Sequence, residues 1–241
     1  MSAHSSGSTC SSTTARFRGV RWPFRRPVVV SWMTLVEDEQ GVPAPVALRT
    51  VGCPEQTERE MLQAFLVDIS SVGPADLVSW GGAATDIPQL MLSAGIHGVT
   101  LPECLKSFGQ PFDMRGRRHT DLMLAMGHNA ARVHLAEMAA ALEIPVKPVG
   151  APTAVAGYIE AGKWSLVRST AEADVLTTSL ILAHYLQLTT SSCAGPMCDR
   201  IASFAANMTH RPFAGEFAAY RDRLRAVALS DAWWSRQRFA A

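Results

Sequence analysis

Apolar residues form strand-like runs in the first part of this chain and recur at helical spacing further along. Residues 27–36 are rich in β-branched side chains and predict a buried strand, with a weaker strand expected at 46–51. The stretch 57–60 reads Thr-Glu-Arg-Glu, which is a capping box, and apolar residues then follow at helical spacing to about Ser70. The opening therefore predicts a strand hairpin and a helix whose apolar face covers the sheet.

The middle of the chain predicts alternating strand and helix. Residues 77–80 form a short apolar strand that runs into Gly81 and Gly82, and a helix is expected from about Asp86 to Gly95. Further helices are expected at 135–142, 153–161, 163–188, 196–208 and 214–229. Strands first, then mixed elements and finally helices alone predict an α/β fold with a mixed β-sheet flanked by helices.

The ends of the chain differ from its centre. Residues 1–26 are rich in Ser, Thr and Arg and have no periodicity, which predicts a disordered or irregular N-terminus; an organellar transit peptide would have the same composition. The domain is expected at residues 27–190. Residues 191–241 are expected to form a helical C-terminal extension packed on it.

Composition narrows the class of protein. The 241 residues, 48% of them apolar, suffice for one α/β domain, and the net charge of +1 points to no particular polyanionic partner. Five scattered cysteines without a Cys-x-x-Cys pair argue against a structural zinc site or a disulfide framework and favour a reduced, cytoplasmic setting. No apolar run approaches about 20 residues, so we expect no membrane span. The pattern indicates no particular oligomeric state.

Two aspartates stand out as candidates for chemistry. Asp86 follows a predicted strand and two glycines, where open α/β sheets place their ligands, but an Asp before Ile-Pro is also a good helix N-cap. Asp174 shares a helix face with the apolar stripe that should point at the core, so its carboxylate must pair with an arginine, accept hydrogen bonds or bind a cation. Glu172 falls on the far side of the same helix and is expected to be solvated.

Other polar and aromatic residues give further candidates. His119 and Asp121 lie two residues apart, as on one side of an extended segment, and could act as ligand or base or form a local hydrogen-bonding network. The adjacent Trp233 and Trp234 could stack bases or pack back on the domain.

Several segments resemble one known family in their order and spacing. They are residues 26–32 (RPVVVSW), 60–65 (EMLQAF), 77–88 (LVSWGGAATDIP), 119–123 (HTDLM), 144–147 (IPVK) and 172–178 (EADVLTT). Together they make residues 26–188 resemble the predicted 3′-5′ exonucleases of family-B-polymerase type, which belong to the DEDD exonucleases of the ribonuclease H-like superfamily. The resemblance implies a ribonuclease H-like sheet.

The resemblance also implies a two-metal mechanism, in which carboxylates hold two Mg²⁺ or Mn²⁺ ions roughly 4 Å apart. The family uses an Asp and a Glu from an Asp-x-Glu on the first strand, an Asp of the second motif and an Asp of the last helix. Asp86 and Asp174 match the last two and are the implied metal ligands. Thr170 stands where the family's general-base or water-orienting Tyr lies, although a Thr hydroxyl replaces a phenol poorly. Asp121 is a further catalytic candidate.

The first motif is missing from the sequence. Its Asp-x-Glu should precede the strand that begins at Val28, yet no acidic residue occurs before Glu37. Gly81 and Thr85 also replace the Asn and Phe of the second motif. Either the start lies inside the gene and a true first strand is omitted, or this relative has lost catalysis.

Three functional interpretations follow. The first is a 3′-5′ exonuclease that acts on the ends of single-stranded DNA with Mg²⁺ or Mn²⁺. The second is a catalytically inactive module of the same fold that binds nucleic acid through the same cleft and the basic ends of the chain. The third is a structural or partner-binding α/β domain, because fold alone does not decide function.

Overall fold

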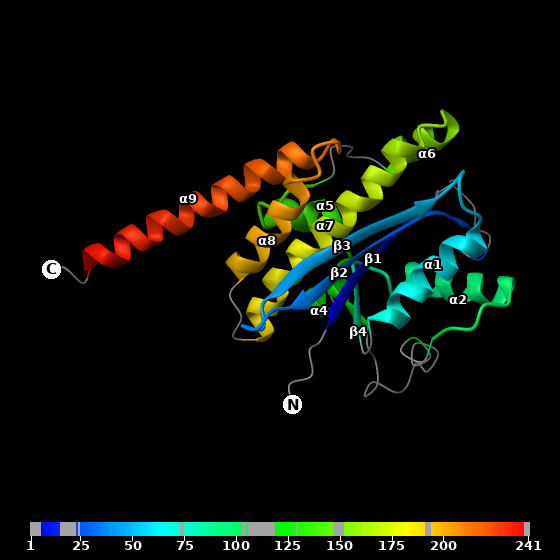
Figure 1. Cartoon of the computed structure of the whole chain (residues 1–241), viewed down its shortest axis with the longest axis horizontal. Coiled ribbons are helices and arrows are strands. Elements are labelled where there is room, and N and C mark those ends of the chain that lie inside the picture. The colour runs from blue at the N-terminus through cyan, green and yellow to red at the C-terminus, as the bar shows by residue number, and fades with distance from the viewer. Residues whose placement is uncertain are drawn as a thin grey trace.

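A mixed sheet lies at the centre of the computed structural model, which describes residues 6–14, 23, 25–72, 75–102, 105, 119–128, 130–146, 152–190 and 194–238. Its strands are β1 (Ser6–Thr14), β2 (Pro27–Glu37), β3 (Pro43–Gly52), β4 (Ala75–Ser79) and β5 (His119–Asp121). They lie in the order β3-β2-β1-β4-β5 (Figure 1). β1 and β3 are antiparallel to β2, and β1 and β5 are parallel to β4. The sheet is therefore mixed, as the sequence predicts.

β1 corrects the expectation for the N-terminus. Composition predicts a disordered or irregular start over residues 1–26, whereas β1 occupies the central position of the sheet, between β2 and β4. That expectation depends on an apolar pattern, which the Ser- and Thr-rich sequence of β1 lacks. β1 instead satisfies its backbone groups by pairing on both edges, and threonine also suits extended backbone. Residues 1–5, 15–22 and 24 lie outside the described part of the chain.

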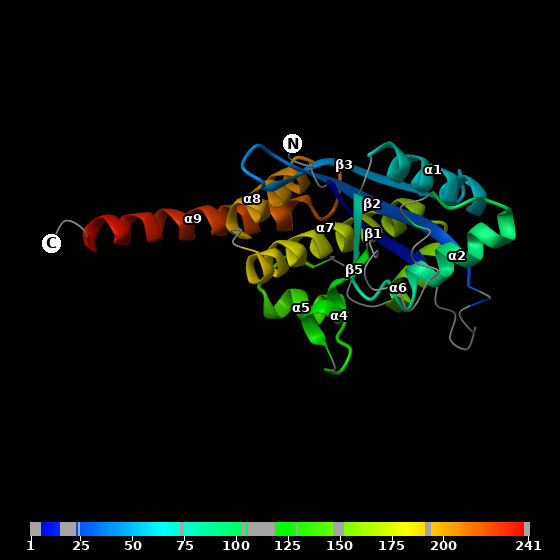
Figure 2. The ribbon, with the colours of Figure 1, turned by 90° about the horizontal axis from the view of Figure 1, so that it is seen from below.

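Helices cover both faces of the sheet (Figures 1 and 2). Two of them, α1 and α2, enclose the core on one face, and α7, α8 and the start of α9 enclose the core on the other. The helix bounds are α1 (Glu58–Ser71), α2 (Asp86–His97), α4 (Leu122–Gly127), α5 (Leu135–Ala141), α6 (Pro152–Glu160), α7 (Trp164–Thr189), α8 (Ala194–Ala206) and α9 (Ala214–Arg238).

The side chains of β2 explain why the two cores separate. Val30 and Trp32 belong to the core beside α1 and α2, while Met33 and Leu35 belong to the core beside α7 and α8. Successive side chains of a strand point to opposite faces of the sheet. A single run of buried residues in β2 therefore supplies side chains to the cores on both faces of the sheet.

The helix ends follow local signals in the sequence. α1 begins at the predicted capping box, because Thr57 Oγ1 accepts a hydrogen bond from the Glu60 N–H and the Glu60 carboxylate accepts one from the Thr57 N–H. α2 runs past Gly95 to His97, and Gly98 ends it with a φ of 60° in the left-handed region.

The C-terminal helices divide into a packed part and a projecting part. α8 and the first turns of α9 share the core of α7, where Phe213 and Phe217 stack edge to face with ring centroids 5.7 Å apart. The second half of α9 extends away from the domain (Figure 1). Trp233 and Trp234 lie in this half, and their side chains are outside the described structure. Among the described helices, none combines the length and apolar character that a bilayer span requires.

Candidate active site

The segment between β4 and α2 carries Asp86 on a tight loop. Gly81 has a φ of 70°, a conformation that favours glycine, and the Ile87 N–H donates to the Gly82 carbonyl to start the helix. A Cβ added to Gly82 would lie 2.6 Å from the Ser79 Cβ and 3.2 Å from Asp86 Oδ2. The bare backbone of Gly82 therefore lets the Asp86 carboxylate lie close against the end of β4.

Asp121 holds this loop in place. Its Oδ1 accepts hydrogen bonds from the Gly81 N–H at 2.8 Å and the Met123 N–H at 3.1 Å, and its Oδ2 accepts one from the Ala83 N–H at 3.0 Å. The residue is 7% exposed and is also the N-cap of α4. Both carboxylate oxygens are committed to backbone donors, so Asp121 positions the loop that carries Asp86.

A second polar link joins the same two strands. Ser79 Oγ lies 2.8 Å from His119 Nε2 and accepts a hydrogen bond from the Gly82 N–H at 3.2 Å. Ser79 is 1% exposed. His119 and Asp121 therefore belong to a local hydrogen-bonding network around the loop, which is one of the two interpretations that the sequence allows.

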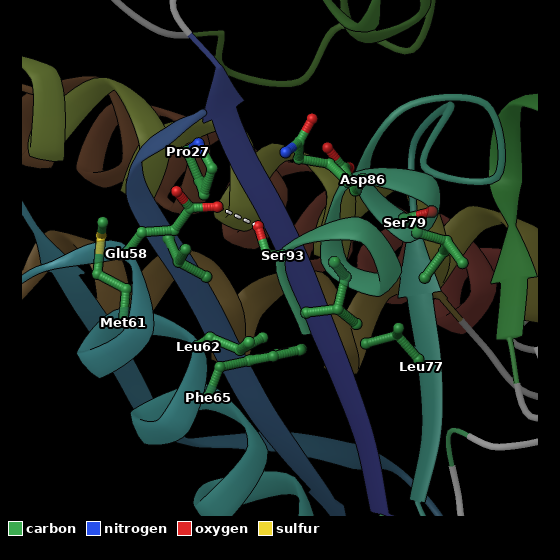
Figure 3. A pocket seen from close by; sticks show the side chains of 13 residues that line it. Pro27, Glu58, Met61, Leu62, Phe65, Leu77, Ser79, Asp86 and Ser93 are labelled. Atoms are coloured by element: carbon green, nitrogen blue, oxygen red, sulfur yellow. Dashed lines mark hydrogen bonds between the residues drawn. The ribbon is translucent and has the colours of Figure 1, made fainter. Parts of the chain in front are cut away.

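Asp86 is the first residue of α2, and Thr85 occupies the N-cap position. The Thr85 side chain makes no capping bond; its hydroxyl donates to the Gly81 carbonyl instead. The expectation that Asp86 caps the helix therefore places the cap one residue too late. A carboxylate in the first turn still interacts favourably with the helix N-terminus. Figure 3 shows Asp86 beside Ser79 at one side of a cavity that both residues line.

Asp174 lies in the middle of α7, on the opposite layer from Asp86, and it is partly buried. α7 packs on β1 and β2, so this helix covers the face of the central strands opposite α2. Thr170 lies one turn earlier, is 4% exposed, and donates its hydroxyl proton to the Leu166 carbonyl at 2.8 Å. The two aspartates come from different layers of the fold. Their meeting at one cation stays a prediction.

Glu172 corrects another expectation. Sequence reasoning predicts a solvated side chain, whereas Glu172 is 2% exposed and its Oε1 accepts a hydrogen bond from the Arg211 guanidinium at 2.6 Å. Burial raises the pKa of the Glu172 carboxyl, and Arg211 opposes that change. The prediction is wrong because α7 is covered on two sides, by the sheet and by α8, so the face away from Asp174 is also interior.

The carboxylates of the candidate site suit part of the metal chemistry that the resemblance implies. Carboxylate oxygens suit Mg²⁺ and Mn²⁺, and Mg²⁺ is often held by one or two carboxylates together with substrate phosphates. Within the described residues, no group of three or more His, Cys, Asp or Glu side chains could hold a metal. β1 carries no acid in Ser6–Thr14. Asp86 and Asp174 stay the two predicted ligands of one cation, and the described residues do not supply a four-carboxylate set for two.

Comparison with a solved polymerase structure shows the fold. The chain matches a family B DNA polymerase from the hyperthermophilic archaeon Pyrobaculum calidifontis with a TM-score of 0.56 and 15% identity over 84% of this chain and 29% of the polymerase. It also matches E. coli Exonuclease I in complex with a dT13 oligonucleotide, with a TM-score of 0.40 and 13% identity over 76% of this chain and 46% of that enzyme. The fold is α/β, with a ribonuclease H-like mixed sheet flanked by helices.

Sequence comparison gives the family. Among curated proteins, none matches the chain. Residues 19–221 match the model of a family described as a predicted 3′-5′ exonuclease related to the exonuclease domain of PolB. The match covers most of the chain and begins after β1. The sequence resemblance is therefore confirmed, and this chain belongs to the family of predicted 3′-5′ exonucleases related to the exonuclease domain of PolB.

Proposed function

We propose that this chain acts on the 3′ ends of single-stranded DNA and hydrolyses terminal phosphodiester bonds with Mg²⁺ or Mn²⁺. Family membership supports the reaction class. The observation that carries the proposal is the loop after β4, where Asp121 accepts three backbone hydrogen bonds and Gly82 leaves room for the Asp86 carboxylate. A catalytic carboxylate requires neighbouring groups that hold it in one position, and this loop supplies such groups around Asp86.

Asp86 and Asp174 are the proposed cation ligands. A bound cation would neutralise charge on the scissile phosphate and lower the pKa of a bound water. Asp121 serves by holding the loop rather than by touching the ion. The Thr170 hydroxyl bonds to its own helix, so it is a poor substitute for a water-orienting phenol. We therefore expect slow hydrolysis compared with an enzyme that has all four carboxylates.

A second candidate function is binding of nucleic acid without hydrolysis. It is favoured by β1, which holds the central position of the sheet and has no carboxylate in Ser6–Thr14. Residues 15–26 contain five arginines and no acidic residue, which adds positive charge to the sequence before β2. In both cases we propose a cytoplasmic setting, since the sequence has five scattered cysteines without a Cys-x-x-Cys pair, which favours a reduced compartment.

The test uses a 5′-labelled single-stranded oligonucleotide with Mn²⁺ and three proteins: the wild-type chain, Asp174→Ala and Asp222→Ala. Asp222 has a side chain that is 64% exposed on α9 and provides a matched control. Stepwise shortening by the wild type and Asp222→Ala, but not by Asp174→Ala, would support the exonuclease. Salt-sensitive binding without shortening would support the binding module. Absence of both would reject the two proposals.

A further inference from the structure

The core beside α1 and α2 is hollow. A cavity with about 40 Å³ of space for the centres of water-sized molecules, part of it open to solvent, lies between these helices and the sheet (Figure 3). One water molecule needs about 10–15 Å³ of such space, and protein interiors rarely keep voids larger than that. The apolar part of the lining comes from four elements and includes Val30, Met61, Phe65, Leu77, Ile87 and Leu90.

Gln89 gives this apolar lining one unsatisfied donor. It lies on α2, lines the cavity and is 5% exposed. Its Nε2 is buried and has no hydrogen-bond partner in the structure. Buried polar groups of native proteins are nearly always paired, because an unpaired donor loses its hydrogen bonds to water. An occupant with an acceptor oxygen would supply the missing partner.

The rim of the cavity selects against charged ligands. The Glu58 carboxylate accepts a hydrogen bond from Ser93 Oγ, and Arg26 Nε and His97 Nε2 each lie 3.5 Å from Glu58 Oε2. The Arg26 guanidinium at this rim is therefore already paired with Glu58. Asp86 lines the opposite side of the cavity (Figure 3). The apolar lining makes burial of any ionised group costly.

We propose that this cavity binds a small neutral organic molecule that is largely apolar and carries one carbonyl or hydroxyl oxygen. The ring or chain of the ligand fills the space between Phe65, Leu77 and Ile87, and its oxygen accepts a hydrogen bond from Gln89 Nε2. Asp86 begins the helix that carries Gln89, so the ligand stabilises the element that holds the candidate active site. The proposal goes beyond nuclease function and does not depend on it.

Three probes of similar size test the proposal: acetophenone, which has a carbonyl, ethylbenzene, which has no acceptor, and benzoate, which is an anion. Binding to the full chain is followed by the methyl NMR shifts of Leu62, Leu77 and Ile87. We expect acetophenone and ethylbenzene to shift these methyl groups and benzoate to leave them unchanged.

Gln89→Leu tests the hydrogen bond. We expect this variant to weaken acetophenone binding relative to ethylbenzene binding by about fivefold, the effect of one neutral hydrogen bond. The matched control is Gln63→Leu, the same substitution at an exposed position of α1, which should leave the ratio of the two dissociation constants unchanged.

Leu90→Trp tests the location, because it fills the cavity and should abolish binding of both neutral probes. Circular dichroism checks its folding; if this variant does not fold, the wild-type and Gln89→Leu titrations still decide. The proposal is overturned if acetophenone does not shift the lining methyl groups of the wild type, if benzoate binds equally well, or if Gln89→Leu leaves the ratio unchanged.

Discussion

The two faces of the sheet are packed differently. Beside α7 and α8, side chains such as Leu176, Leu180 and Ile181 have no exposed surface. Beside α1 and α2, the core borders a partly open cavity that Asp86 also lines. The same sheet therefore has a filled layer that supplies rigidity and a hollow layer that retains space next to the candidate active site. The predictions below test this contrast.

Truncation of core leucines should give the largest difference between the layers. Leu180→Ala removes contacts in a filled core and should lower the free energy of unfolding by about 3–5 kcal/mol. Leu62, which lines the cavity, already lacks some neighbours, so Leu62→Ala should cost about 2–3 kcal/mol. Urea unfolding of both variants measures the losses. Equal losses would remove the contrast between the layers.

The next effect concerns the loop on the hollow side. Asp121→Asn keeps the shape of the side chain but removes the charge that accepts three backbone hydrogen bonds, and it should lower stability by about 2 kcal/mol. The amides of Gly81 and Ala83 should also exchange hydrogen faster. Asp76→Asn, the same change at an exposed position of β4, should stay within about 0.5 kcal/mol of wild type. Similar losses in both variants would contradict the role of Asp121 in holding the loop.

One added methyl group should have opposite signs on the two faces. Val30→Ile extends a side chain into the cavity and should raise stability by about 0.5–1 kcal/mol. Val175→Ile adds the same group to a residue with no exposed surface in the filled core and should cost about 1 kcal/mol or more. Thermal unfolding of the pair gives the signs directly. A gain at Val175 or a loss at Val30 would show that the layers are not packed as described.

The smallest effect is a pH dependence on the filled side. Burial raises the pKa of the Glu172 carboxyl above its ordinary value of 4.5, so the folded chain keeps this proton where the unfolded chain has released it. The stability from this group is fully present below pH 4.5 and is lost as the pH rises through the folded pKa. Glu172→Gln lacks this titration, so its stability relative to wild type should increase with pH over that window.

Unfolding midpoints of Glu172→Gln measured from pH 4 to pH 8 check this expectation. Glu160→Gln, an exposed change on α6, is the control and should follow the wild type at every pH. A stability difference between Glu172→Gln and wild type that does not vary with pH would contradict the burial argument.

Local signals in the sequence predict much of the fold. The β-branched run of β2, the capping box of α1 and the helical spacing of α7 each act within a few residues, so their elements can be read from sequence. β1 has no such signal, because its place depends on β2 and β4 pairing with it. Its Ser and Thr residues would suit a loop equally well.

The site is less accessible to sequence reasoning than the fold. Asp86 and Asp174 could be nominated from motif and helix face, but the role of Asp121 could not, because its bonds reach back about 40 residues to Gly81 and Ala83. The helical pattern predicts a solvated Glu172, because it identifies only one apolar face of α7 and cannot show that α8 covers another side. Gln89 gave no signal, since its significance comes from a cavity formed by residues distant in sequence.

The central position of β1 sets an order of events during synthesis. Ser6 of β1 pairs with Ala75 of β4, which leaves the ribosome about 70 residues later, roughly 4–14 s at ordinary rates. β2 can pair with β1, and β3 with β2, well before that, so a three-stranded intermediate would wait with one edge of β1 unpaired. Unpaired edges promote association between chains. The yield of folded protein should therefore depend on how fast the segment up to β4 emerges.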